Sequence, residues 1–191
     1  MIIAVCGKKG SGKDSIANYL IEKYGFKREK FADPIKKIAL IMYPTWGERH
    51  IEGDLKEIVD PEYGISPRQV MQVIGDDFAQ KFLCENFPEY RETTGRKLWV
   101  RNLIKRIDLS QNYVISDMRY VHESHELHDK VDEVLIVKVE RSSINNKDEH
   151  RSENQIRFIT PDRLFTNDQG LDVLYKKVDN MIESSNFMRE N

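Results

Sequence analysis

A glycine-rich segment near the start of the chain constrains the fold most. The apolar run Ile2–Cys6 leads directly into Gly7-Lys8-Lys9-Gly10-Ser11-Gly12-Lys13-Asp14, where an amphipathic stretch begins. A buried strand, a glycine-rich turn, a lysine and a helix in this order are typical of a phosphate-binding loop, whose N–H groups surround phosphate oxygens. Lys13 is then expected to reach the β- and γ-phosphates of a nucleotide. The sequence therefore predicts nucleotide binding at this loop.

One position departs from the usual pattern of such a loop. The residue after the lysine is normally Ser or Thr, whose hydroxyl ligates Mg²⁺, whereas this chain has Asp14 followed by Ser15. A carboxylate can hold Mg²⁺ directly or through water, and Lys8 and Lys9 can offset its charge. An acidic residue in the first helical turn is also favoured by the helix dipole. Both a metal-binding and a purely structural role are therefore open for Asp14.

Strand and helix patterns alternate along the chain, which is typical of a parallel sheet with helices on both faces. We expect a three-layer αβα fold with a five-stranded parallel sheet, and ligands beyond the carboxyl ends of its strands. All 191 residues are expected to form a single domain, with a surface insertion near 43–65 and a lid near 140–157. The predicted strands are 2–6, 26–31, 113–116, 133–139 and 164–166, and the predicted helices are 13–24, 34–42, 67–83, 96–107, 121–129 and 171–184.

The composition argues against several classes of partner. Thirty Lys and Arg residues against 32 Asp and Glu residues give a net charge of −2, so no overall field favours nucleic acid or an anionic membrane. No apolar run approaches the roughly 20 residues needed to cross a bilayer. The start of the chain lacks a basic leader and a cleavage site, and two cysteines cannot form a disulfide framework. We therefore expect a cytoplasmic protein that binds neither nucleic acid nor membrane.

Polar residues follow the other predicted strands at the expected ligand edge. Asp117 and Arg119 come after strand 113–116, where a carboxylate can hold Mg²⁺ and a guanidinium can bind phosphate. A helix cap with a surface ion pair is the alternative for these two residues. Asn167 follows the last strand, where it could contact adenine or simply end the strand.

The predicted helix 67–83 carries candidates for a second substrate. Arg68 and Gln72 lie one helical turn apart, so Arg68 could bind a phosphate and Gln72 a base or sugar. A solvated helix face explains the same spacing. Asp33 and Lys36 follow the second strand, although Asp33 could be only a helix cap. In the lid segment, Arg141 and His150 are expected to enter the site when it closes and excludes water.

Six further segments, in addition to the Ser-Gly-Lys-Asp loop, resemble those of one enzyme family. The chain is similar to the deoxynucleoside monophosphate kinases of large bacteriophages and, more distantly, to animal-type phosphomevalonate kinases. The resemblance covers about residues 1–182 apart from the insertion; at Asp33 the family has glycine. The matching segments are Ala32-Asp33-Pro34-Ile35-Lys36, Arg68-Gln69-Val70-Met71-Gln72-Val73-Ile74-Gly75, Trp99-Val100, Ser116-Asp117-Met118-Arg119, His150-Arg151-Ser152-Glu153 and Thr166-Asn167-Asp168.

The resemblance implies a P-loop kinase that transfers the γ-phosphoryl group of ATP, with Mg²⁺, to a deoxynucleoside 5′-monophosphate and gives the diphosphate. The expected catalytic residues are Lys13, Arg68, Arg119 and Arg141. ATP would be bound by Gly7, Lys9, Gly10, Ser11, Gly12, Lys13, Asp14, Ser15 and Asn167, and Mg²⁺ by Asp14, Ser15 and Asp117. The acceptor would be bound by Asp33, Lys36, Arg68, Gln72, Asp117, Arg119 and His150.

Two alternatives stay open at this point. The acceptor could be another phosphorylated metabolite such as phosphomevalonate, because the loop does not distinguish between acceptors. The chain could also be a nucleotide-binding regulatory protein or NTPase with no acceptor, although three arginines outside the loop exceed what ATP alone needs. The protein could form a homodimer.

Overall fold

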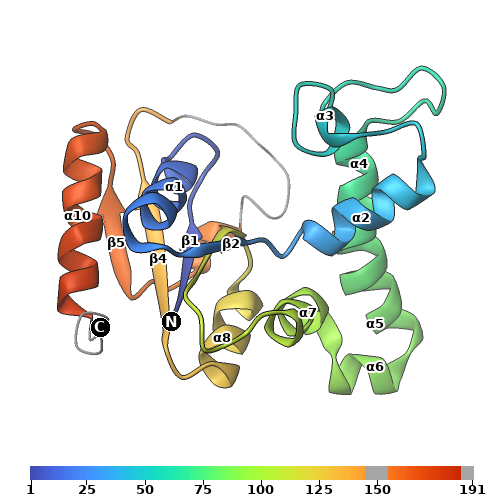
Figure 1. Ribbon diagram of the computed structural model, residues 1–191. Coiled ribbons are helices and arrows are strands. Elements are labelled where there is room, and N and C mark those ends of the chain that lie inside the picture. Colours follow the sequence, from blue (N-terminus) through green and yellow to red (C-terminus); the bar gives the residue numbers. More distant parts are fainter. Residues whose placement is uncertain (145–154, 186–191) are drawn as a thin grey trace. The chain divides into compact units, whose positions relative to one another are not determined.

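The computed structural model describes residues 1–144 and 155–185 (Figure 1). The chain divides into two compact units. Unit 1 combines Met1–Lys30 with Leu103–Asn191, and unit 2 is Phe31–Asn102. The prediction of one domain over the whole chain stays a prediction, since a kinase domain can contain more than one compact unit.

Unit 1 is built on a five-stranded parallel sheet, which confirms the predicted sheet. Its strands have the order β2-β3-β1-β4-β5 and every neighbouring pair is parallel. The order reverses at β1, so β1 and its two neighbours form the switch point beyond which ligands bind in such sheets. The strands are β1 (Ile2–Cys6), β2 (Lys27–Glu29), β3 (Tyr113–Met118), β4 (Val134–Glu140) and β5 (Arg163–Thr166).

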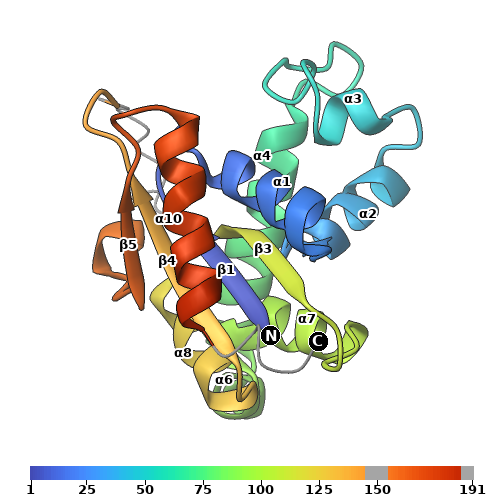
Figure 2. The same ribbon diagram turned by 60° about the vertical axis from the view of Figure 1, so that its left-hand side comes forward.

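Helices cover both faces of this sheet. Ile3 and Val5 of β1 share a core with α1 (Lys13–Tyr24) and α10 (Leu171–Ser184), which lie on one face (Figure 2). The alternate residues of β1 are buried on the other face, where α8 (Val121–Lys130) packs against β4. Because consecutive strand residues point to opposite faces, a strand buried at every position must lie in the middle of three layers.

Unit 2 is helical. It contains α2 (Asp33–Met42), α3 (Glu48–Ile51), α4 (Pro67–Gln72), the π-helical segment η1 (Val73–Phe82), α5 (Leu83–Asn86), α6 (Pro88–Thr93) and the 3₁₀ turn η2 (Gly95–Lys97). Helix α7 (Leu98–Arg106) begins in unit 2 and ends in unit 1. In the predicted insertion, the buried Trp46 stacks on Tyr43 at 4.0 Å and donates a hydrogen bond of 2.7 Å to Asp60. Residues 43–65 therefore have a small core of their own.

The middle of the predicted helix 67–83 differs from the α-helical expectation. Val70, Ile74, Phe78 and Phe82 recur at four-residue spacing, as on one face of an α-helix, but Phe78 and Phe82 are about half exposed. In the π-helical segment the buried residues instead recur five apart, as Ile74 with Ala79 and Gly75 with Gln80. A π-helix bonds residue i to i+5, so the wider turn moves positions four apart off the buried face. The four-residue spacing indicates a helix here but does not identify it as a π-helix.

No helix within residues 1–144 and 155–185 is both long and apolar enough to cross a membrane.

Candidate active site

The glycine-rich loop is held between the carboxyl ends of three strands of unit 1. Gly7 has φ +151°, and a Cβ there would lie 2.4 Å from the carbonyl oxygen of Val139 in β4. Gly12 has φ +113°, and a Cβ there would lie 2.6 Å from the amide nitrogen of Asn167. Only glycine meets both the backbone angle and the close approach at these positions. The glycines required by the motif therefore fix how the loop sits against β4 and β5.

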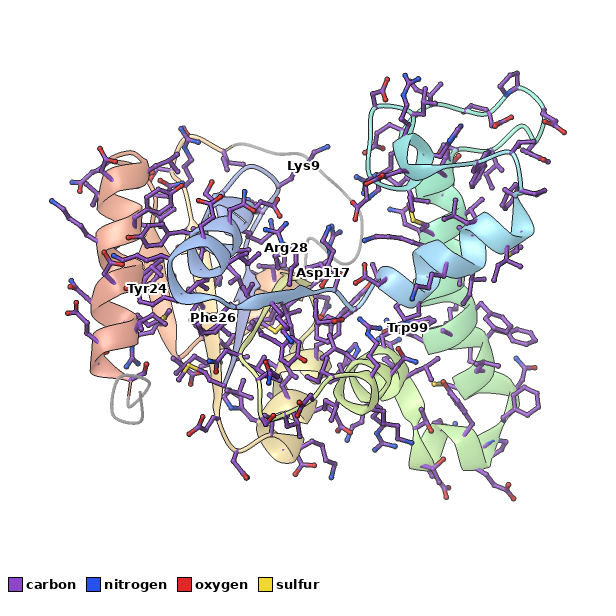
Figure 3. All side chains as sticks on the ribbon, in the orientation of Figure 1. Lys9, Tyr24, Phe26, Arg28, Trp99 and Asp117 are labelled. Atoms are coloured by element: carbon purple, nitrogen blue, oxygen red, sulfur yellow. The ribbon has the colours of Figure 1, made fainter. Side chains whose placement is uncertain are left out.

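The side chain of Lys13 is hydrogen-bonded to the backbone of the loop. Its ammonium donates hydrogen bonds to the carbonyl oxygens of Gly7 at 2.7 Å and Lys8 at 2.8 Å. Lys9 is exposed and extends away from the sheet (Figure 3). The loop thus concentrates N–H groups and one lysine ammonium at the start of α1, which is the arrangement that binds phosphate.

Asn167 supports the loop from the end of β5. Its side-chain amide donates a hydrogen bond of 2.8 Å to the carbonyl oxygen of Ser11, and only 6% of the residue is exposed. Its backbone N–H donates to the carbonyl oxygen of Glu140 at 2.8 Å. The observed contact is therefore with the protein backbone, and the predicted contact with adenine stays a prediction.

A cavity of about 420 Å³ adjoins the loop on the side of β4 and β5. Ser11 lines it, is 1% exposed, and its hydroxyl has no hydrogen-bond partner among the residues that the structure describes. Arg141 and Lys138 also line the cavity, and the ammonium of Lys138 lies 3.4 Å from Glu140. Sequence reasoning missed Lys138; the available signal was a charged residue interrupting the apolar strand 134–139.

Asp14 lies at the mouth of the loop, where 76% of its side chain is exposed. Arg28 on β2 approaches it to 3.8 Å. Asp14 and the neighbouring Ser15 offer hard oxygen donors directly after Lys13, which is the donor type that Mg²⁺ prefers. Arg28, which the sequence had not indicated, contributes to balancing the negative charge at this position.

Asp117 lies within β3, one residue before its end, rather than after the strand as predicted. Ala4 pairs with Ile115 and Cys6 with Met118, so β3 carries one extra residue at this point, a β-bulge. Such bulges re-aim side chains and are common beside active sites.

The turn after β3 is held by Glu123, which sequence reasoning missed. Its Oε2 accepts hydrogen bonds from the backbone N–H groups of Arg119 at 2.7 Å and Tyr120 at 2.9 Å. Burial raises the pKa of Glu123 to about 8, against the opposing effect of these two N–H groups, and the charge of Asp117 adds to the rise. A Ser or Thr three residues earlier would have signalled the cap in the sequence, but that position is Tyr120.

The acceptor candidates Asp33 and Lys36 lie together on α2 in unit 2. The Lys36 ammonium contacts Asp33 at 2.8 Å and also forms an ion pair with Glu52. Burial alone would lower the pKa of Lys36, but the hydrogen bonds to the two carboxylates outweigh it and raise that pKa. Asp33 lies at the first position of α2, after the N-cap Ala32, so the structure places it inside the helix rather than at its cap.

Arg68 is the second residue of α4 and forms an ion pair with Glu57 of the insertion. Its Nε donates to Glu57 at 2.6 Å, and its backbone N–H donates to the carbonyl oxygen of Lys56 at 2.9 Å. Gln72 is the last residue of the same helix. The two acceptor candidates of unit 2 that carry a positive charge, Lys36 and Arg68, are therefore paired with carboxylates of residues 43–65, Glu52 and Glu57. The sequence had not linked these carboxylates to them.

The predicted site residues fall into two groups. The loop, Asn167, Asp117, Arg119 and Arg141 lie at the carboxyl edge of the sheet in unit 1. Asp33, Lys36, Arg68 and Gln72 belong to unit 2. His150 and most of the predicted lid lie outside the described residues.

Comparisons with known proteins identify the family and the fold of this chain. The family model described as deoxynucleotide monophosphate kinase matches residues 1–58 and 46–178. A protein of Acanthamoeba polyphaga mimivirus, provisionally named a deoxynucleotide monophosphate kinase, is 28% identical over 197 residues, covering 98% of this chain and 99% of the relative. Among solved structures, shikimate kinase from Aquifex aeolicus vf5 matches with a TM-score of 0.54 and 13% identity, over 98% of this chain and 99% of its own. That last likeness identifies the fold as the three-layer P-loop kinase fold.

Proposed function

The chain belongs to the deoxynucleotide monophosphate kinase family, and from this we propose how its residues carry out the reaction. The protein is a kinase that transfers a phosphoryl group from ATP to a deoxynucleoside 5′-monophosphate and gives the diphosphate. The observation that most supports our assignment of residues is that a phosphate-binding loop and the Asp117–Arg119 turn share the switch-point edge of one sheet.

We assign the binding of ATP to unit 1. The N–H groups of the loop and the ammonium of Lys13 would bind the phosphates. The adjoining cavity, at about 420 Å³, has a size typical of small-molecule sites and would hold the base and sugar. Arg141 lines that cavity and could stack on the base while its charge remains close to the phosphates.

The chain also offers residues suited to Mg²⁺. This ion is commonly held by one or two carboxylates together with waters and substrate phosphates. Asp14 presents a largely exposed carboxylate beside the loop, and Asp117 presents one from the bulge of β3. These two residues, with the hydroxyl of Ser15, would hold the ion, which when bound neutralises charge on the transferring phosphoryl group.

We assign the binding of the acceptor to Arg68, Gln72, Asp33 and Lys36, with Arg119 on its phosphate. The phosphate of a nucleoside monophosphate is already a nucleophile at neutral pH, so the reaction needs no strong general base. Alignment of the two substrates and neutralisation of charge by Lys13, Arg68, Arg119 and Arg141 would supply most of the catalysis. The role of His150 in the acceptor site stays a prediction.

A panel of acceptors tests this assignment. Purified protein with Mg-ATP would be assayed for ADP and for phosphorylated product with each dNMP, each NMP, phosphomevalonate and dephospho-CoA. We expect one or more dNMPs to stimulate ADP release with stoichiometric formation of the dNDP. Stimulation by a non-nucleotide acceptor alone would retain the donor site and overturn the acceptor. A rate of ADP release that is the same with and without each acceptor would overturn the roles of Arg68 and Gln72.

A further inference from the structure

A buried acidic side chain binds the turn that carries Arg119. Glu123, in the first turn of α8, accepts the N–H groups of Arg119 and Tyr120 with the same oxygen, at 2.7 and 2.9 Å. These two groups follow the last residue of β3, Met118, so they lie beyond the strand. One side chain therefore satisfies the first two N–H groups after the strand.

The burial of Glu123 is unusual for a residue that caps a helix. Only 5% of the residue is exposed, whereas acidic side chains are rarely buried so completely because burial of a charged group is costly. A helix start can be capped by an exposed Ser, Thr or Asp without burying an acid. The cost of burying the group indicates that the geometry of this particular turn matters beyond ending a strand.

The other side of the turn is constrained by the sheet. The bulge in β3 between Ile115 and Met118 sets the direction of Asp117, while Cys6 of β1 fixes the position of Met118 through strand pairing. Arg119 is then the first residue outside the ladder. Its backbone direction depends on what binds its N–H group, and that partner is Glu123.

We propose that Glu123 is a positioning residue for phosphoryl transfer: by accepting the N–H groups of Arg119 and Tyr120, it holds the Arg119 side chain where it can act on the phosphate. The proposal rests on the role assigned to Arg119 in the proposed function. It assigns to Glu123 no contact with either substrate. Its effect is expected in kcat, because a displaced charge stabilises the transition state less well.

Three substitutions of Glu123 distinguish the effect of its side-chain length from the effect of its acidic group. Glu123→Gln keeps an acceptor oxygen at the same distance from the backbone, whereas Glu123→Asp keeps the acid but shortens the side chain by one methylene group. Glu123→Ala removes the acceptor altogether. We expect Gln to retain most of the wild-type kcat, and Asp and Ala to lose up to about 100-fold, with little change in KM for ATP. Retention of kcat by Asp with loss by Gln would overturn the proposal.

A double-mutant cycle with Arg119→Lys tests whether Glu123 acts through Arg119. Lys keeps the charge but loses the planar fork of the guanidinium, so measurable activity is expected to remain. If Glu123 positions Arg119, the loss of kcat caused by Glu123→Asp is much smaller in the Arg119→Lys background. An equal fold loss in both backgrounds would overturn the proposal in favour of a general effect on folding.

Two controls make the outcomes distinct. Asp179→Asn removes a hydrogen-bonded carboxylate on α10, so it reports the effect of lowered stability alone on kcat. All variants are assayed at a temperature where circular dichroism shows them folded. Wild-type protein is assayed in parallel with the acceptor panel. If it phosphorylates no dNMP, the proposed function is overturned. If it is active and the effects of Glu123→Asp and Arg119→Lys on kcat are independent of each other, only the role of Glu123 is overturned.

Discussion

The side-chain amide of Asn167 donates a hydrogen bond of 2.8 Å to the carbonyl oxygen of Ser11 and so ties the end of β5 to the phosphate-binding loop. The two residues are 156 positions apart in the chain. The loop's conformation therefore depends on the far end of the sheet as well as on its own glycines.

Removing the hydrogen bond between Asn167 and Ser11 is expected to weaken ATP binding. Asn167→Ala leaves the Ser11 carbonyl oxygen without its partner, which costs about 1–3 kcal/mol for a buried group and loosens the loop. We expect KM for ATP to rise while KM for the acceptor changes little. Asn112→Ala is the matched control, because Asn112 bonds the amino terminus beside β1, away from the loop. Equal effects of the two variants on KM for ATP would contradict the account.

Gly12→Ala is expected to abolish the loop geometry. The added Cβ would lie 2.6 Å from the amide of Asn167 and 3.2 Å from Leu174, at a φ of +113°. Gly25→Ala provides the comparison, since Gly25 also has a positive φ but has no atom within 4 Å of the added Cβ. Backbone strain alone costs about 1–2 kcal/mol. Chemical denaturation should show that loss for Gly25→Ala with normal KM for ATP, and a larger loss with impaired ATP binding for Gly12→Ala.

The pH dependence of stability should reflect Asp179. Burial pushes the pKa of Asp179 upward, but hydrogen bonds from Lys23, Tyr24 and Tyr19 outweigh it and hold the pKa below its usual value. An acid whose pKa is lowered by folding stabilises the protein above its usual pKa, near 4, and loses this contribution as the pH falls through the folded value.

Asp179→Asn is therefore expected to destabilise the protein by on the order of 1 kcal/mol at pH 7, with the difference from wild type vanishing in acid. Thermal denaturation between pH 7 and pH 3 measures this difference. Glu183→Gln, an exposed acid on the same helix, should show no such trend. A constant difference between wild type and Asp179→Asn at all pH values would rule out the ion-pair explanation.

Arg68→Ala should separate the two substrates. If Arg68 binds the acceptor phosphate, its loss raises KM for the dNMP by about 10-fold or more and leaves KM for ATP nearly unchanged. Arg49→Ala is the control within unit 2, because Arg49 is largely exposed and pairs with Asp54 in the same insertion. Steady-state kinetics with each substrate varied in turn gives both constants. An equal rise in both constants for Arg68→Ala would place this residue outside the acceptor site.

Much of the sheet and of the donor site could be predicted because both depend on local patterns. The apolar run Ile2–Cys6, the glycine-rich loop and the polar residues after β3 and β5 are all readable within a few neighbouring positions. The parallel order of the strands then brings the loop and the Asp117–Arg119 turn to one edge.

The features that were missed depend on contacts between distant residues. The indole N–H of Trp99 donates to the carbonyl oxygen of Gly75, 24 positions away, and the helix around Gly75 is π-helical, which the spacing of Phe78 and Phe82 does not reveal. Likewise, the pairing of Arg68 with Glu57 depends on the fold of the insertion. Periodicity identifies which face of a helix is apolar, but it does not identify the partner of a charge.

The most direct test is transfer of the γ-phosphoryl label of ATP to a dNMP by wild-type protein and by Lys13→Ala. Lys176→Ala, which removes an exposed lysine on α10, is the control. We expect labelled dNDP from wild type and from Lys176→Ala, and a loss of at least about 100-fold for a folded Lys13→Ala, because one charge at the transferring group is removed. Labelled dNDP formed by Lys13→Ala at the wild-type rate would contradict the assignment of the loop as the phosphate site.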